Sequence, residues 1–208
     1  MTTATAPRER GFESADIARI AVFAALIGVL GLPGSISIGG AVPITAQTLG
    51  VMLAGAVLGA RRGALAVIAL LVLVAIGLPL LSGGRGGLGA FVGPSAGYLF
   101  GWIAGAAVIG LVVRLGAARP RWWRVALGAV VGGIGVIYLF GVPVQSMVTG
   151  LGLWETIVTS LVFLPGDLVK AALTVIITMA LWKAYPRAFA WPRRAPSEPI
   201  PAGAPSEA

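Results

Sequence analysis

The charged residues of this chain are separated by long apolar stretches. The uncharged stretches comprise 41, 22, 28 and 30 residues, and they lie between Arg19 and Arg61, Arg62 and Arg85, Arg85 and Arg114, and Arg124 and Glu155. A helix needs about 20 apolar residues to cross the hydrocarbon core of a bilayer. Charged residues make up 11% of the chain and hydrophobic residues 58%, whereas about 25% of a soluble domain is charged. This pattern excludes a soluble protein and predicts an integral membrane protein.

The apolar stretches divide into six predicted helices, which makes the expected fold an all-α membrane protein with six transmembrane helices in a compact bundle. We expect the helices at about 17–32, 44–60, 63–81, 93–115, 122–148 and 157–184. A connection rich in Gly, Pro and Ser (33–43) separates the first two helices. The predicted organisation is a cytoplasmic segment (1–16), a six-helix transmembrane domain (17–185) and a disordered Pro-rich cytoplasmic tail (186–208).

The basic residues indicate how the bundle is oriented. If the N-terminus is cytoplasmic, 13 of the 15 Lys and Arg residues fall on the cytoplasmic side. Arg85 is the basic residue in an outer connection, and Lys170 lies inside a span. The positive-inside rule therefore predicts a multi-pass protein of the cytoplasmic membrane with both termini inside. The net charge of +8 is explained by this orientation in the lipid bilayer, and no nucleic-acid partner is expected.

Several kinds of chemistry are excluded by residues that the sequence lacks. The chain has no His and no Cys, which rules out a His or thiolate metal site, a Cys nucleophile and a Ser-His-Asp triad. It has no G-x-x-x-x-G-K-[ST] motif, so it cannot bind ATP through a P-loop. We expect no metal, no cofactor and no catalytic residue. A membrane hydrolase that uses Lys170 and a serine is the remaining enzymatic alternative.

Two ionisable residues are expected inside the membrane. Asp167 and Lys170 lie three positions apart in FLPGDLVKAAL (163–173), so they share one face of a helix. About 20 Å of helix separates Lys170 from Lys183 at 1.5 Å per residue, which places Lys170 in the outer part of the bilayer. Such residues are costly in lipid and usually functional. They either neutralise each other or line a pocket that opens to the outside.

A glycine-rich segment, GGRGGLGAFVGPSAGY (83–98), carries Arg85. Glycines let backbone N–H groups approach a ligand closely, and the helix after Gly93 presents its positive end outward. Together these features suit a carboxylate, and the alternative is a mobile loop whose Arg85 binds lipid headgroups. Gln47 can hydrogen-bond to a neighbouring helix or to a ligand, and Tyr98 is an interfacial anchor unless the pocket reaches it.

Small residues four positions apart predict close helix contacts, which drive helix association in lipid. They form three glycine stripes and one alanine pair, namely Gly93, Gly97, Gly101 and Gly105; Gly55 and Gly59; Gly128 and Gly132; and Ala21 and Ala25. We expect the glycines to pack inside the bundle. Ala21 and Ala25 fit either internal packing or contact with a partner membrane protein.

With these residues in view, the chain resembles the BioY family, the biotin-specific substrate-capture (S) components of energy-coupling-factor (ECF) transporters. The similarity rests on VPITAQTLGVMLAGAVLG (42–59), GGRGGLGAFVGPSAGYLFGW (83–102) and FLPGDLVKAAL (163–173), in that order, and covers about residues 15–185. Where the family commonly has G-P-T-G-G-Y, this chain has G-P-S-A-G-Y, so Ser95 keeps a hydroxyl and Ala96 adds a methyl group.

The resemblance implies a non-enzymatic subunit for high-affinity biotin uptake, or for uptake of another small vitamin. It also implies a transmembrane coupling protein and two ATP-hydrolysing subunits as partners, with Ala21 and Ala25 facing the coupling protein. Asp167 and Lys170 match ligand-contacting positions of the family. On this hypothesis Asp167 accepts hydrogen bonds from the ureido ring, Lys170 meets a polar oxygen of the ligand, and Arg85 compensates the charge of the tail. Gln47 and Tyr98 are lesser candidates.

Overall fold

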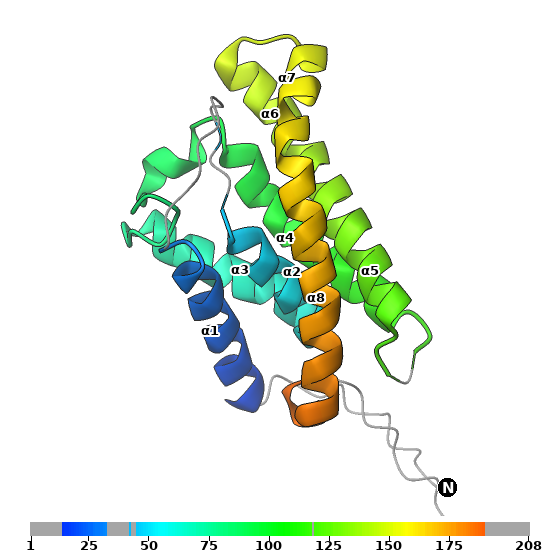
Figure 1. The fold of residues 1–208 in the computed structure, drawn as a ribbon. Coiled ribbons are helices and arrows are strands. Elements are labelled where there is room, and N and C mark those ends of the chain that lie inside the picture. Colours follow the sequence, from blue (N-terminus) through cyan, green and yellow to red (C-terminus); the bar gives the residue numbers. More distant parts are fainter. Residues whose placement is uncertain (1–13, 33–41, 43–44, 118, 190–208) are drawn as a thin grey trace, which may run out of the picture.

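The computed structural model of the chain describes residues 14–32, 42, 45–117 and 119–189, which form a helical bundle (Figure 1). The helices are α1 (Ser14–Val29), α2 (Gln47–Leu58), α3 (Ala60–Ala75), α4 (Ala96–Arg114), α5 (Trp122–Val130), α6 (Ile137–Thr149), α7 (Leu153–Ser160) and α8 (Leu164–Ala184). Short 3-10 and π-helical pieces are η1 (Leu88–Phe91), η2 (Val131–Val136), η3 (Leu161–Phe163) and η4 (Pro186–Ala188). Because η2 joins α5 to α6 and η3 joins α7 to α8, the elements form six helical units, as predicted.

Three of these units are long and apolar enough to cross a membrane within the described part of the chain. They are Ala96–Arg114, Trp122–Thr149 and Leu153–Ala184. The other three are shorter: α1 and α3 have 16 residues each and α2 has 12. Gly59 separates α2 from α3 with a φ of +84°, a conformation that glycine adopts without strain. The chain therefore reverses direction over a single residue at this point.

The observed bounds differ from the predicted ones mainly at the ends. Helix α1 begins at Ser14, so its first turn uses residues assigned to the N-terminal segment, whose remainder lies outside the described residues. At the other end of the chain, η4 and Phe189 belong to the fold, and Phe189 packs edge-to-face on Trp182 with ring centroids 5.0 Å apart. The predicted tail therefore does not begin at 186, and residues 190–208 lie outside the described part. So does most of the predicted 33–43 connection.

Helix α4 lies at the centre of the bundle and packs against α2, α3, α5 and α6 (Figure 1). Its glycines allow close approach of the neighbouring backbones: a Cβ added at Gly101 would lie 2.9 Å from the carbonyl oxygen of Ile137, and one at Gly105 would lie 2.7 Å from that of Gly132. This confirms internal packing for the helical part of the stripe. Gly93 was grouped with it wrongly, because it precedes α4 and, among the described residues, an added Cβ would meet only Gly89 O, at 4.0 Å.

The other predicted glycine positions also pack inside the bundle. Gly55 lies against Ala106 and Ile109 of α4, Gly128 lies against Ile109 and Val113, and Gly59 lies against the Arg114 guanidinium.

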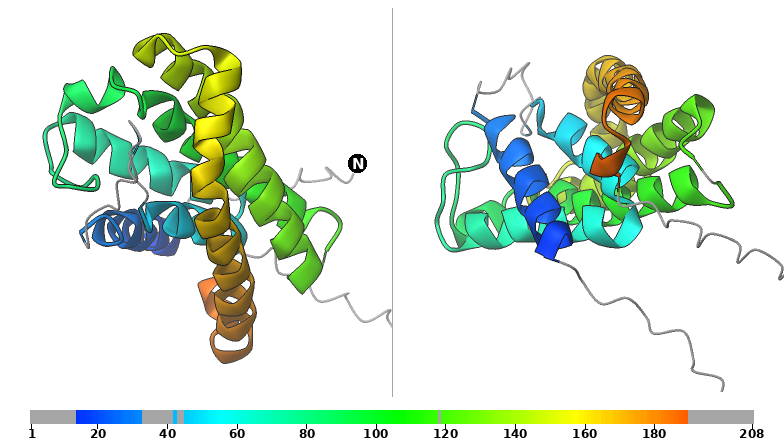
Figure 2. Two further views of the ribbon diagram at one scale, coloured as in Figure 1. Left: turned by 45° about the horizontal axis from the view of Figure 1, so that its top comes forward. Right: turned by 90° about the horizontal axis from the view of Figure 1, so that it is seen from below.

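Charged side chains join several elements at the end of the bundle where α4 finishes. The buried Asp16 carboxylate accepts hydrogen bonds from Arg19 Nη1 at 3.1 Å and from Arg62 Nη2 at 2.8 Å, which ties α1 to α3. Arg19 Nη2 also donates to the Arg187 carbonyl, at 3.0 Å. The second view of Figure 2, from below, shows η4 turning back from the end of α8. One charged cluster therefore fixes the starts of α1 and α3 and the end of the described chain.

Substituting Gly132 tests the central packing, and Gly135 of the same segment η2 supplies a matched control. A Cβ at Gly132 would lie 2.7 Å from Gly105 O and 2.9 Å from Ile109 N, whereas one at Gly135 would meet only Val130 O, at 3.8 Å. Overpacking of this kind costs about 1–3 kcal/mol, while both substitutions gain the same helix propensity. We expect Gly132→Ala to lower the melting temperature in detergent by several degrees relative to Gly135→Ala. Equal melting temperatures would contradict this contact between η2 and α4.

Candidate functional site

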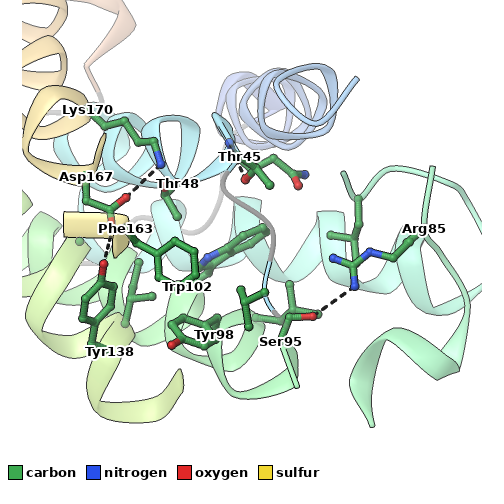
Figure 3. A pocket seen from close by; sticks show the side chains of 16 residues that line it. Thr45, Thr48, Arg85, Ser95, Tyr98, Trp102, Tyr138, Phe163, Asp167 and Lys170 are labelled. Atoms are coloured by element: carbon green, nitrogen blue, oxygen red, sulfur yellow. Dashed lines mark hydrogen bonds and ion pairs between the residues drawn. The ribbon is translucent and has the colours of Figure 1, made fainter. Parts of the chain in front are cut away.

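A pocket opens among the first turns of α2, α4 and α8, at the opposite end of α4 from Arg114 (Figure 3). All five predicted ligand-binding residues line it, although they come from four separate parts of the chain. The lining comprises Val42, Thr45, Gln47, Thr48, Leu81, Arg85, Ser95, Tyr98, Leu99, Trp102, Gly133, Ile137, Tyr138, Phe163, Asp167 and Lys170. The structure thus brings the predicted residues together, and whether they bind a ligand stays a prediction.

The most polar part of the pocket is built around Asp167. Its side chain is 7% exposed, and Lys170 Nζ donates to Asp167 Oδ1 at 2.9 Å. The Tyr138 hydroxyl donates to the other oxygen, Oδ2, at 2.6 Å. Both residues of the ion pair line the pocket, so the pair neutralises itself and also faces the cavity. The two roles that the sequence suggested for these residues, mutual neutralisation and lining a pocket, are therefore compatible.

Tyr98 faces the pocket through its ring, while its hydroxyl is held inside the protein. The hydroxyl donates to Gln145 Oε1 at 2.8 Å and lies 3.2 Å from Ser160 Oγ. All three side chains are buried, and they connect α4 to α6 and α7. The Tyr98 ring also meets that of Tyr138 edge-to-face, with centroids 6.1 Å apart. Tyr98 is therefore a fixed wall of the pocket, since the pocket does reach this residue.

The Arg85 loop is held to the bundle by several hydrogen bonds. Leu81 and Arg85 exchange backbone hydrogen bonds of 3.0 and 3.2 Å across Gly83 and Gly84, whose φ values are +75° and +69°. Glycine suits these positive angles. Arg85 Nε donates to Ser82 O at 3.2 Å and its Nη1 to Ser95 Oγ at 3.4 Å. The guanidinium is therefore directed at the start of α4 by a closed hairpin.

Gln47 anchors that loop from inside the bundle. Its Nε2 donates to Ile27 O of α1 at 3.2 Å and to Leu80 O at 3.0 Å, and its Oε1 accepts from the Ser82 backbone N–H at 3.2 Å. Both amide hydrogens are thus used by the protein. The side chain bonds to a neighbouring helix while it also lines the pocket, and it leaves a ligand only the second lone pair of its oxygen.

Apolar side chains separate the Asp167–Lys170 pair from Arg85. Figure 3 shows Phe163 and Trp102 between these two polar ends. Pockets of this kind, mostly apolar with a few placed polar groups, bind small molecules. Tyr138 and Trp102 were not singled out by the sequence analysis: Trp102 ends the 83–102 motif, whereas Tyr138 lies in an apolar helix with no motif around it. No cluster of three or more potential metal ligands occurs within the described ranges.

The two alanines predicted to face a partner lie outside the pocket. Ala21 and Ala25 are exposed on α1, where they share a surface with the exposed Val22 and Val29. They are therefore not buried by internal packing in this chain, and contact with a partner stays a prediction.

Comparison with known proteins finds relatives over most of the chain. Residues 2–187 match the model of the BioY family. The biotin transporter BioY of Rhizobium etli is 50% identical over 177 residues, which are 82% of this chain and 95% of the relative. That of Rhodobacter capsulatus is 46% identical over 182 residues, or 83% of this chain and 96% of the relative.

A solved structure has the same fold. The S-component for biotin from an ECF-type ABC transporter superposes with a TM-score of 0.77 at 33% identity, covering 83% of this chain and 95% of that one. The chain therefore belongs to the BioY family and is a multi-pass membrane protein.

Proposed function

We propose that the protein is the biotin-binding S component of an ECF-type transporter and that the pocket around Asp167 holds the vitamin. Its family, the printed functions of its relatives and the fold of the solved biotin S-component support this function. The observation that carries the site is the buried carboxylate facing the pocket. Asp167 has one hydrogen-bond donor on each oxygen, from Lys170 and Tyr138, and each oxygen can accept a further bond.

The two polar ends of the pocket suit the two polar ends of biotin. The ureido ring offers two N–H donors, one of which a carboxylate can accept, and one carbonyl oxygen, which an ammonium or a hydroxyl can approach. We assign the ring to Asp167 and Lys170. The valerate tail ends in a carboxylate, and Arg85 is exposed at the far side of Trp102 and Phe163 with guanidinium N–H groups left over from its bonds to Ser82 and Ser95 (Figure 3). We assign the tail to Arg85.

The geometry gives the hydrolase alternative no support. Lys170 Nζ donates to Asp167, and among the described residues no serine hydroxyl bonds to it. The pocket serine, Ser95, accepts from Arg85 instead. A nucleophile needs a base within hydrogen-bond reach, and this pair is missing from the described site. Binding without bond cleavage fits the pocket better.

Energy for uptake would come from partner subunits. The chain has no P-loop, so we propose that it works with a transmembrane coupling protein and two ATPase subunits, the coupling protein contacting the exposed face of α1 at Ala21 and Ala25. We also propose that it lies in the cytoplasmic membrane with both termini inside. The Asp16, Arg19 and Arg62 cluster would then face the cytoplasm, and the pocket at the other end of the bundle would open outward.

Replacing Asp167 tests the proposed site. Asp167→Ala leaves a ureido donor without its acceptor in a desolvated pocket and removes the carboxylate that pairs with Lys170. We expect at least a hundred-fold loss of affinity for labelled biotin, measured on purified protein in detergent with other vitamins as competitors. Glu155→Gln is the control, because Glu155 is an exposed carboxylate outside the pocket, and it should bind as the native chain does. Native affinity in Asp167→Ala would remove this residue from the site.

The orientation can be tested because the chain has no cysteine. Glu155 and Arg119 are both exposed and lie in connections predicted to be outside and inside, respectively. In right-side-out vesicles, a membrane-impermeant maleimide should label Glu155→Cys at once and Arg119→Cys only after the vesicles are opened. The opposite order of labelling would reverse the proposed topology.

A further inference from the structure

The hydroxyl of Thr48 is buried and has no hydrogen-bond partner among the described residues. Thr48 lies in the first turn of α2 and lines the pocket. Its Oγ1 is inaccessible to solvent and makes no hydrogen bond with any described residue. A buried hydroxyl of this kind is unusual, because proteins bond nearly all of their buried polar groups.

Other buried hydroxyls in the same region are satisfied. Thr174 Oγ1 donates to Lys170 O at 2.8 Å, Ser160 Oγ to Thr156 O at 2.7 Å, and Thr156 Oγ1 to Gly152 O at 3.0 Å. Within the described ranges, three buried hydroxyls lack a partner, those of Thr48, Ser82 and Thr178. Of these three, only Thr48 lines the pocket. The unpartnered hydroxyl therefore belongs to a residue that lines the pocket.

The surroundings of Thr48 specify the kind of ligand atom that it would meet. Helix α2 packs on α8, and Figure 3 shows the Thr48 side chain on the side of the pocket where Asp167 and Lys170 lie. Asp167 can only accept hydrogen bonds and Lys170 can only donate them. A threonine hydroxyl can donate to an acceptor that lies beside an N–H group bound by the carboxylate. In a ureido group, the carbonyl oxygen is such an acceptor, because its carbon carries both N–H groups.

We propose that the Thr48 hydroxyl donates a hydrogen bond to the ureido oxygen of bound biotin and thereby helps to select ligands that carry this group. This inference rests on the proposed function. It assigns Thr48 a role in specificity, because a site with a buried hydrogen-bonding group rejects analogues that leave the group unpaired. When the ligand is absent, the hydroxyl makes no hydrogen bond with the described residues.

Two valine substitutions separate binding from stability. Thr48→Val keeps the shape of the side chain and removes the hydroxyl, and Thr178→Val does the same at a buried orphan hydroxyl in α8 outside the pocket. We expect Thr48→Val to weaken binding of labelled biotin about ten-fold, equivalent to about 1.4 kcal/mol, while Thr178→Val binds normally. Without biotin, both variants should melt at or above the native temperature, because each loses an unsatisfied polar group. Thr48→Ser should bind within about three-fold of the native chain.

Biotin methyl ester tests which end of biotin contacts Thr48, because it keeps the ureido ring and lacks the tail carboxylate. The native protein should also bind the ester about ten-fold more tightly than Thr48→Val does. A ratio that vanishes with the ester would place Thr48 at the tail and overturn the assignment. Equal binding by native protein and Thr48→Val, equal weakening in Thr178→Val, or an equal loss in Thr48→Ser would each overturn the role of the hydroxyl. Failure of the native protein to bind biotin would instead overturn the proposed function itself.

Discussion

A carboxylate inside an apolar bundle is stable only when both of its oxygens are bonded, and the arrangement around Asp167 follows from this requirement. Charges in a membrane interior are costly unless they are paired. Lys170 is supplied by the same helix three residues later, and the Tyr138 hydroxyl is supplied by α6. The Tyr138 hydroxyl must therefore come within 2.6 Å of Asp167 Oδ2, and this bond links α6 to α8 beside the pocket. Lys170 and Tyr138, which stabilise the buried carboxylate, therefore also line the pocket.

The glycines of α4 make that wall possible. Because Gly101 and Gly105 have no side chain, the backbone of Ile137 and Gly132 approaches α4 closely. Tyr138 directly follows Ile137, and both line the pocket. Segment η2 is π-helical just before this point, and such segments often occur at functional sites. Gly133, within η2, packs on Met52 of α2 and lines the pocket as well. Close packing in the centre and the open pocket at one end thus depend on the same helix contact.

Sequence reasoning predicted the elements of this structure better than the contacts between them. Apolar stretches indicated six helices because spans in lipid need long uncharged segments. The pairing of Asp167 with Lys170 was predictable because three positions on a helix bring side chains together. Tyr138 lies 29 residues from Asp167, and no local pattern reveals a contact over that distance. The same holds for Thr48: only the structure shows that its hydroxyl has no hydrogen-bond partner among the described residues. Gly93 was wrongly grouped with the helical glycines, because residues four positions apart share a face only inside a helix and α4 begins at Ala96.

Gln47 shows how the pocket is joined to the rest of the bundle. One amide bonds to the end of α1, to Leu80 and to Ser82, and Ser82 in turn accepts from Arg85. A movement of the Arg85 hairpin away from the pocket must therefore break the bonds of Gln47 to the loop, or else carry the start of α2 and the end of α1 with it. Breaking them would leave buried amide groups unsatisfied, which is costly in a medium without water. The Arg85 hairpin, the start of α2 and the end of α1, the helix with the exposed Ala21 and Ala25, are therefore held together by a single buried side chain.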